Sequence, residues 1–298
     1  MRRPSSKFGA GRAGISLAWP ALAGCVAAGA AVLTACAASD TPPAAGPRVL
    51  KVAHRGGAGL APENTLAAFE VGLAHRADLL ELDVHLSKDG QLVVVHDASL
   101  ARTTNLSGEV ADYTAAELAA ADAAAKFVGP AAAGPQPIPT LAQVLALASG
   151  RAGVQVEIKV RSDRSRYPGI EAKVVDALRS HAMLAEAVVM SFDFPTVREV
   201  KRIEPRLRTC ALISTTHLSS IGRLEPARIA DEIVGLGAEY VGVNHAGLTE
   251  ALFAALTGRG LRVGVWTVND PADMRRFAAQ GVAFITSDRP DLLQQAIG

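Results

Sequence analysis

Cysteine is scarce in this 298-residue chain, and its scarcity excludes a fold held together by several disulfides. The three cysteines are Cys25, Cys36 and Cys210, and the first two lie in an N-terminal segment that we expect to be processed. Cys210 lies in the apolar run 209–213, where a packed core thiol is expected rather than a nucleophile. Stability must therefore come from a hydrophobic core.

Acidic residues are absent before Cys36, while four basic residues precede an Ala/Leu/Val-rich stretch at 15–34. This order is typical of an export signal. The run Leu33-Thr34-Ala35-Cys36 resembles a bacterial lipobox, whose cysteine is lipidated and becomes the new N-terminus. We therefore expect residues 1–36 to be a lipoprotein-type signal peptide, and the body to be anchored to a membrane in the periplasm or at the cell surface.

Two alternatives remain for this leader. A second lipobox-like run ends at Cys25, although cleavage there would leave an apolar mature start. The segment could also be a simple signal peptide or an uncleaved anchor, since its apolar stretch approaches the ~20 residues that span a bilayer. All of these place the body outside the cytoplasm.

No excess of positive charge is left once the leader is removed. The whole chain has 30 Lys+Arg and 29 Asp+Glu, and the leader takes away four basic residues and no acid. The remaining net charge of −3 argues against a nucleic-acid partner.

The composition of 37–48 is that of a flexible tether, and 49–298 has the size of one (β/α)₈ barrel. Short apolar runs alternate with amphipathic stretches, which predicts parallel strands separated by helices. The fold class is therefore α/β, as a (β/α)₈ TIM barrel, with an open doubly wound sheet as the alternative. The predicted strands are 49–53, 79–86, 154–160, 187–192, 209–213, 239–243, 262–267 and 283–286, and the predicted helices are 64–75, 140–148, 169–181, 194–204, 226–236, 249–258, 270–280 and 289–297.

The apolar run 92–95 breaks this alternation, because it follows the second strand too closely for a parallel crossover. It should return antiparallel as a hairpin. A four-residue loop at 87–90 would place His96 opposite Glu81, facing inward, whereas a three-residue loop would turn His96 to the other face. Residues 98–139, with a weak helix at 114–120, are then an insertion after the hairpin and a candidate lid.

Carboxylates inside the predicted strands are costly to bury unless they are paired or bind metal. Glu81 and Asp83 share a strand face, and Glu157 and Lys159 share another. Three carboxylates with few histidines nearby form an oxygen-rich site suited to Ca²⁺ or Mg²⁺. The alternative is a set of buried salt bridges, in which Lys159 pairs with Glu157 and Arg55 with Glu81.

Two histidines accompany this cluster. His54 ends the first strand and His96 ends the returning run, so both suit acid–base work near neutral pH. His85 follows Asp83 by two residues and could extend the cluster, but it lies near the hairpin tip, where contact with solvent or with the lid is expected.

The ordered motifs HRGGAGLAPENTLAAFEVGL, ELDVHLSKDGQLVVVHD, VEIKV, MSFD, VWTVN and SDRPD resemble those of the glycerophosphodiester phosphodiesterases, over essentially all of 49–298. The resemblance implies a TIM barrel that hydrolyses glycerophosphodiesters, such as glycerophosphocholine and glycerophosphoethanolamine, to sn-glycerol 3-phosphate and an alcohol.

Carried over by position, the resemblance assigns proton transfer to His54 and His96. It implies that Glu81, Asp83 and Glu157 bind Ca²⁺ or Mg²⁺ and that Arg55 and Lys159 bind phosphate. It places Glu63 at the edge of the site and Trp266 in the wall of the substrate pocket. Asn64 could simply cap the helix that follows it. SDRPD departs mildly from the usual Thr-containing form of the last motif.

Two other functions are compatible with these residues. A related barrel could act on intact phospholipids as a phospholipase C or D, or a non-catalytic exported protein could bind phosphodiesters without cleaving them. The complete histidine and carboxylate set argues against the second.

Overall fold

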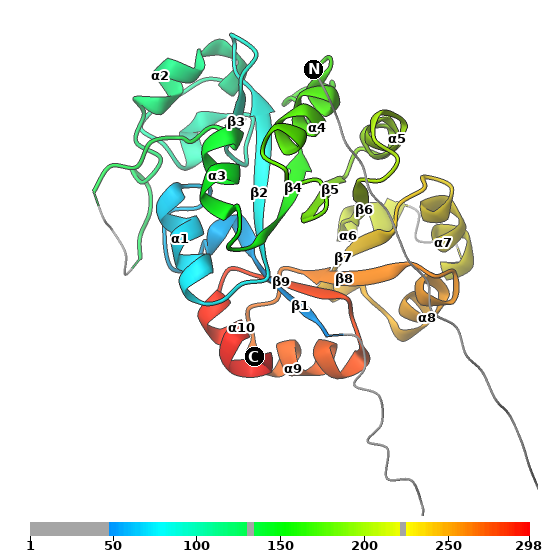
Figure 1. Cartoon of the computed structure of the whole chain (residues 1–298). Coiled ribbons are helices and arrows are strands. Elements are labelled where there is room, and N and C mark those ends of the chain that lie inside the picture. The colour runs from blue at the N-terminus through cyan, green and yellow to red at the C-terminus, as the bar shows by residue number, and fades with distance from the viewer. Residues whose placement is uncertain (1–47, 130–133, 221–224) are drawn as a thin grey trace, which may run out of the picture. The chain divides into compact units, whose positions relative to one another are not determined.

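The computed structural model describes residues 48–129, 134–220 and 225–298, in which eight parallel strands form a closed barrel (Figure 1). The strands follow one another around the ring in chain order, and β1 pairs with both β2 and β9, which closes it. The TIM barrel is confirmed, and the open sheet is wrong. The strands are Leu50–Ala53 (β1), Leu79–Leu86 (β2), Gly153–Ile158 (β4), Ala187–Ser191 (β5), Arg208–Ile213 (β6), Tyr240–Asn244 (β7), Arg262–Trp266 (β8) and Phe284–Ser287 (β9).

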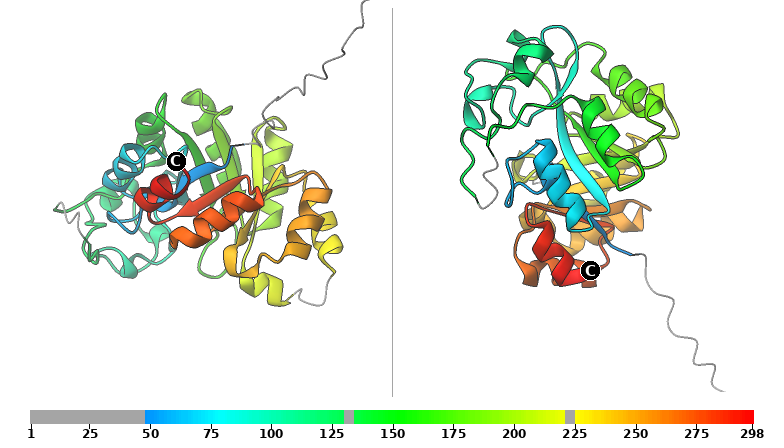
Figure 2. Two further views of the ribbon diagram at one scale, coloured as in Figure 1. Left: turned by 90° about the horizontal axis from the view of Figure 1, so that it is seen from below. Right: turned by 60° about the vertical axis from the view of Figure 1, so that its left-hand side comes forward.

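Helices surround this ring on its outer side, as the views in Figure 2 show. Each predicted helix is present, and Thr65, Thr140, Thr249 and two aspartates accept the hydrogen bonds that start five of them. A short helix, Thr215–Ser220 (α6), was not predicted. The others are Leu66–Ala74 (α1), Ala115–Ala119 (α2), Leu141–Ala148 (α3), Ile170–Ser180 (α4), Phe194–Ile203 (α5), Pro226–Val234 (α7), Glu250–Gly258 (α8), Pro271–Gln280 (α9) and Pro290–Ile297 (α10).

Alternate residues of each strand point to opposite sides of the barrel wall. On β2, Leu80, Leu82 and Val84 are fully buried in the layer between the barrel and its helices. The inward residues of six strands form a separate apolar cluster, which fills the barrel. Gly264 makes room in this interior, because a Cβ there would lie only 2.1 Å from the ring of Phe284.

The returning strand β3, Leu92–Val94, pairs antiparallel with β2, as expected, but in a different register. Leu86 lies opposite Leu92, and the Ser87 N–H donates to the Gln91 carbonyl at 3.0 Å. The loop therefore has three residues and ends in Gly90 with φ +73°, a conformation that favours glycine in such hairpins. The prediction of a four-residue loop was wrong.

The three-residue loop does not turn His96 away from the site, as strand alternation would require. Regular pairing ends at Val94, and the last bond joins the Val95 N–H to the Asp83 carbonyl at 3.1 Å. Because His96 lies beyond the ladder, strand alternation no longer fixes the direction of its side chain.

The insertion after the hairpin packs as a small satellite core. Val93 and Val95 of the returning segment bury their side chains against Leu100, Val110 and Leu118 of the insertion. The predicted weak helix is α2. The insertion is thereby fixed to the same face of the hairpin that carries Asp83.

The signal peptide predicted at 1–36 and the tether up to residue 47 lie outside the described residues. In the part of the chain that is described, none of the helices combines the length and the apolar character needed to cross a bilayer.

Candidate active site

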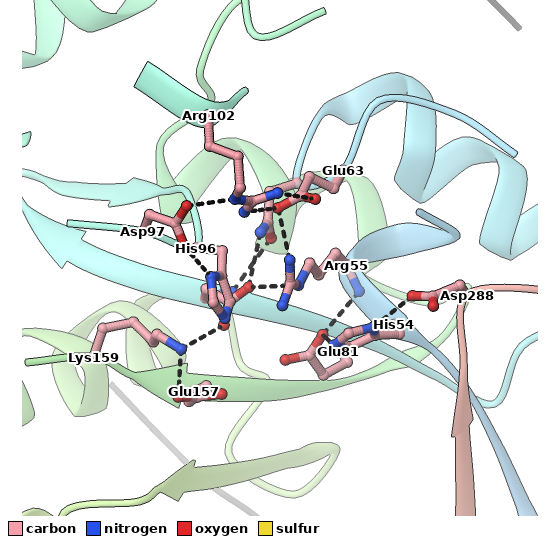
Figure 3. A network of polar contacts seen from close by, with 12 residues as sticks. His54, Arg55, Glu63, Glu81, His96, Asp97, Arg102, Glu157, Lys159 and Asp288 are labelled. Carbon is pink, nitrogen blue, oxygen red and sulfur yellow. Dashed lines mark hydrogen bonds and ion pairs between the residues drawn. The ribbon is translucent and has the colours of Figure 1, made fainter. Parts of the chain in front are cut away.

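The predicted site residues gather at the carboxyl ends of the strands, around a cavity of about 290 Å³. Polar residues form one part of its lining and apolar residues the other. The lining residues are His54, Arg55, Glu81, His96, Gln155, Glu157, Met190, Phe192, Leu212, Trp266, Thr267, Phe284 and Thr286. Lys159 lines an adjoining cavity, and Glu63 contacts Arg55 (Figure 3). Asp83 lies within 3.5 Å of Arg55 and 3.4 Å of Lys159.

His54 directly follows β1, and a carboxylate from the other end of the chain fixes its ring. The Nδ1–H of His54 donates to Asp288 Oδ1 at 2.6 Å, and Asn269 Nδ2 donates to the second oxygen of Asp288 at 2.7 Å. Nε2 of His54 lies 3.9 Å from Glu81 Oε2, on the side of the carboxylate cluster. Burial alone would lower the pKa of His54, but the bond to Asp288 and the charge of Glu81 raise it above the usual value.

His96 has its own carboxylate partner. Its Nδ1–H donates to Asp97 Oδ1 at 2.5 Å, so Nε2 is the ring nitrogen that could transfer a proton. Burial lowers the pKa of His96, and the charge of Asp83 opposes this shift only in part. The two histidines therefore have equivalent partners and opposite pKa shifts.

His85 fixes the backbone that carries His96. It is 1% exposed, so of the two contacts expected for it, with solvent or with the lid, the contact with solvent is wrong. Its Nε2–H donates to the carbonyl of His96 at 3.1 Å, and its Nδ1 accepts from the hydroxyl of Tyr167 at 2.9 Å. Burial lowers the pKa of His85 to about 4, so the ring is neutral at pH 7 and suits both bonds.

Glu81, Asp83 and Glu157 form a compact acidic group on the adjacent strands β2 and β4. One oxygen from each lies within 4.8 Å of the others, and all three side chains are buried. Burial, together with the charge of Asp83, raises the pKa of Glu81 to about 8. Burial also raises the pKa of Glu157, whereas Lys159, His96 and Arg55 hold the pKa of Asp83 well below its usual range in spite of burial.

These three carboxylates fit a divalent cation. Asp83 Oδ1 is buried and accepts no hydrogen bond from the described residues, although Lys159 Nζ lies 3.4 Å away, and three carboxylate ligands match the preference of Ca²⁺ and Mg²⁺. Asn64 prepares the site, since its Nδ2 donates to Asp83 Oδ2 at 2.8 Å. Asn64 is not the helix cap that we considered, because Thr65 accepts the capping bond from Ala68.

The cations Arg55 and Lys159 flank the acidic group. Lys159 Nζ lies 2.7 Å from Glu157 Oε1 and 3.4 Å from Asp83 Oδ1, so this half of the salt-bridge alternative is present. The other half is not as expected. The Arg55 guanidinium contacts Glu63 at 2.8 Å and Asp83 at 3.5 Å, while Glu81 accepts the backbone N–H of Arg55 at 2.8 Å.

Arg55 reaches this position through an unusual backbone. Its φ of 50° and ψ of 34° are left-handed, and Gly56 follows with φ +86°. A Cβ at Gly56 would lie 2.6 Å from the backbone of α1, so glycine permits the close approach. The HRG sequence thereby turns the guanidinium of Arg55 toward Asp83.

Glu63 is held between two arginines and does not line the main cavity. Arg102 from the insertion donates to both oxygens of Glu63, at 2.7 and 2.9 Å, and also donates to Asp97. The insertion therefore contributes one residue, Arg102, that links the partner of Arg55 to the partner of His96.

Trp266 ends β8 in the cavity wall, partly buried, with its ring edge-to-face against Phe192 at a centroid distance of 5.4 Å. Cys210 is fully buried and belongs to the apolar interior, as predicted, and burial raises the pKa of its thiol.

Four contributing residues had not been singled out as site residues. Asp97 adjoins His96 in sequence, Asn269 ends the VWTVN motif and Asp288 belongs to the SDRPD motif, so the sequence carried a signal for these three. Arg102 gave no signal, because it lies in an Ala- and Gly-rich insertion.

Comparison with known proteins is consistent with this geometry. Residues 54–292 match the model of the glycerophosphoryl diester phosphodiesterase family. A protein of Caldanaerobacter subterraneus named glycerophosphodiester phosphodiesterase is 35% identical, over 83% of this chain and 96% of its own length. One of Bacillus subtilis with the same name is 33% identical, over 83% and 86%.

The solved structure of an Oleispira antarctica phosphodiesterase in complex with the product sn-glycerol 3-phosphate is also similar. It superposes with a TM-score of 0.70 at 25% identity, covering 85% of this chain and 97% of that one. Sequence motifs, barrel and site geometry all agree with these matches, and the chain belongs to the glycerophosphoryl diester phosphodiesterase family.

Proposed function

We propose that this protein hydrolyses small glycerophosphodiesters, such as glycerophosphocholine and glycerophosphoethanolamine, to sn-glycerol 3-phosphate and an alcohol. One observation carries the proposal. Two histidines, each bonded through Nδ1 to a carboxylate, line one cavity together with Glu81, Glu157 and Arg55, and the buried Asp83 adjoins these two carboxylates. The named relatives and the product complex of the Oleispira antarctica enzyme support the substrate class.

The first task of such a site is to neutralise the negative charge that protects a phosphodiester from attack. Arg55 and Lys159 supply fixed positive charge in a buried setting, where electrostatic stabilisation is strong. A Ca²⁺ or Mg²⁺ ion held by Glu81, Asp83 and Glu157 would add charge neutralisation at the phosphate oxygens.

Proton transfer is the second task, and it belongs to His54 and His96. One Nε2 takes the proton of the glycerol 2-hydroxyl, whose oxygen bonds to phosphorus. The bond from phosphorus to the headgroup oxygen breaks, and the other histidine protonates the departing alcohol. Water then opens the cyclic phosphate with the two roles reversed, which gives glycerol 3-phosphate.

The size of the main cavity suits a small diester. Its volume of about 290 Å³ is close to the lower limit of about 300 Å³ for ligand sites. Release of diacylglycerol, ceramide phosphate or lysophosphatidate by the purified protein would favour the phospholipase alternative instead.

An enzyme-coupled assay for glycerol 3-phosphate tests the proposal across several glycerophosphodiesters. We expect turnover that EDTA abolishes and that added Ca²⁺ or Mg²⁺ restores. His54→Ala and His96→Ala should each lose at least about a hundredfold in kcat, the usual contribution of acid–base catalysis. His75→Ala, at the end of α1 and outside the cavity lining, is the matched control and should behave as wild type. Turnover that resists EDTA, or near-normal rates in either site variant, would contradict the proposal.

We also propose that the mature protein is a lipoprotein anchored through Cys36. The support is the sequence of the leader alone. Labelling of cells with a radioactive fatty acid should mark the wild-type protein and the Cys25→Ser variant, but not Cys36→Ser. Labelling lost only in Cys25→Ser would move the anchor to that cysteine.

A further inference from the structure

Gln155 on β4 is a buried side chain of the cavity that the mechanism above does not use. It is 1% exposed and lines the same cavity as His54 and Glu81. Neither its amide nitrogen nor its amide oxygen has a hydrogen-bond partner among the described residues. A buried amide of this kind is rare in native structures, because its donor and acceptor groups have lost their water.

Packing does not explain the choice of glutamine. The inward residues of the neighbouring strand β5, Val188 and Met190, are apolar and fill the barrel without a polar group. An apolar residue at 155 would also fill the barrel, without the unfavourable free energy of burying an unpaired amide. The amide therefore suits a polar group brought by a ligand.

The place of Gln155 indicates which part of a ligand it meets. It precedes Glu157 by two residues on the same strand face and lies opposite Glu81 in the register with β2. Two residues of a strand span about 6.6 Å along the strand, so Gln155 lies one inward-facing position deeper in the barrel than Asp83 and Glu157, level with Glu81. With phosphate held by Arg55 at the level of Asp83 and Glu157, a three-carbon alcohol pointing inward would end near Gln155.

The surroundings of Gln155 fit such an alcohol. Met190, Leu212 and Phe284 offer apolar contact to its carbon chain. A hydroxyl both donates and accepts hydrogen bonds, as does the amide of Gln155. Trp266 Nε1 is a second buried donor in this cavity without a partner among the described residues.

We propose that Gln155 binds the terminal hydroxyl of the glycerol group and makes the site selective for phosphodiesters that carry it. The inference rests on the proposed function, since it assumes that phosphate is bound at the acidic group. Gln155 is thus a specificity residue that contacts substrate away from the reacting atoms.

The test compares glycerophosphocholine with 2-hydroxypropyl phosphocholine, which keeps the 2-hydroxyl and lacks only the terminal one. Choline release reports turnover of both compounds. We expect the wild-type protein to prefer glycerophosphocholine by about tenfold to a hundredfold in kcat/KM. Gln155→Leu and Gln155→Met, two apolar residues of similar size, should reduce this preference to near unity by lowering turnover of glycerophosphocholine alone. Using both variants guards against a failure of either one to fold.

Thr209→Val is the matched control. The Thr209 hydroxyl is also buried without a partner among the described residues, but it is not part of the cavity lining. Its removal should leave the preference unchanged.

An equal loss of activity on both compounds in the Gln155 variants, or an unchanged preference, would overturn the role of Gln155 while the proposed function stands. A wild-type protein that hydrolyses neither compound with Ca²⁺ or Mg²⁺ present would remove the proposed function, and this inference with it.

Discussion

Replacement of Asp288 by asparagine tests whether the carboxylate behind His54 is needed for catalysis. The variant keeps the shape of the side chain and removes the charge that accepts the Nδ1–H bond at 2.6 Å. A hydrogen bond to a charged group contributes about 1.5–3 kcal/mol, so kcat should fall about 10- to 150-fold if the charged form of His54 is on the reaction path. KM should change little, because Asp288 does not line the cavity.

The pH profile of kcat gives a second measure of the same change. The bond to Asp288 and the charge of Glu81 raise the pKa of His54 against burial, so Asp288→Asn should move one limb of the profile to lower pH. A shift of the alkaline limb would mean that His54 works as the protonated acid, and a shift of the acid limb that it works as the base. Both limbs must be measured with divalent cation present.

Asp291→Asn is the control for this experiment. Asp291 lies three residues further on and pairs with Arg289 at 2.7 Å, so its loss perturbs the start of α10 and spares His54. An Asp288→Asn variant whose kcat stays within about twofold of wild type, with an unshifted profile, would refute the role given to Asp288.

Three further predictions concern the supports of the site. Asn64→Ala removes the donor to Asp83 and should weaken Ca²⁺ or Mg²⁺ binding about 10- to 100-fold in calorimetric titration. The control Thr65→Ala should lower the free energy of unfolding by about 1 kcal/mol and leave cation affinity unchanged. Equal cation affinities in the two variants would contradict the role of Asn64. His85→Phe removes the hydrogen bond to the His96 carbonyl, so both the free energy of unfolding, by about 1–3 kcal/mol, and kcat should fall. A variant as stable and as active as wild type would show that His85 does not fix His96. In EDTA, the melting temperature should fall as the pH rises from about 6.5 to about 8, because Glu81 with a raised pKa of about 8 and His54 with a raised pKa hold protons in the folded state that the unfolded chain has released. Added cation should give a larger gain at pH 8 than at pH 6.5, and a melting temperature that rises over this range would contradict the pKa shifts.

Periodicity and motif order were sufficient to predict the barrel and the residues around its mouth. The alternation of short apolar runs with amphipathic stretches predicts the strands and helices of the barrel. Charged residues inside an apolar run, such as Glu81 and Asp83, are recognisable as candidate site residues because burying an unpaired charge is unfavourable. The position of Glu157 beside Asp83 then follows from the adjacency of β2 and β4.

What could not be predicted depends on contacts between distant segments or on a single residue of register. The loop at Gly90 has one residue fewer than expected, and the sequence did not indicate that regular pairing would end at Val94, before His96. The pairing of His54 with Asp288 joins residues 234 apart, which no local pattern reports. Gln155 stands between two valines in the sequence, and no local pattern indicates that its amide is buried without a hydrogen-bond partner among the described residues.

The bond between His54 and Asp288 also makes the proposed role of His54 depend on closure of the barrel. His54 follows the first strand and Asp288 follows the last, and the two meet only because β1 and β9 are neighbours in the ring. Such long-range pairing is slow to form. A chain in which the other strands had assembled but β9 had not yet docked would lack the orienting carboxylate of His54, so recovery of activity during refolding should report the closure of the ring rather than the formation of its helices.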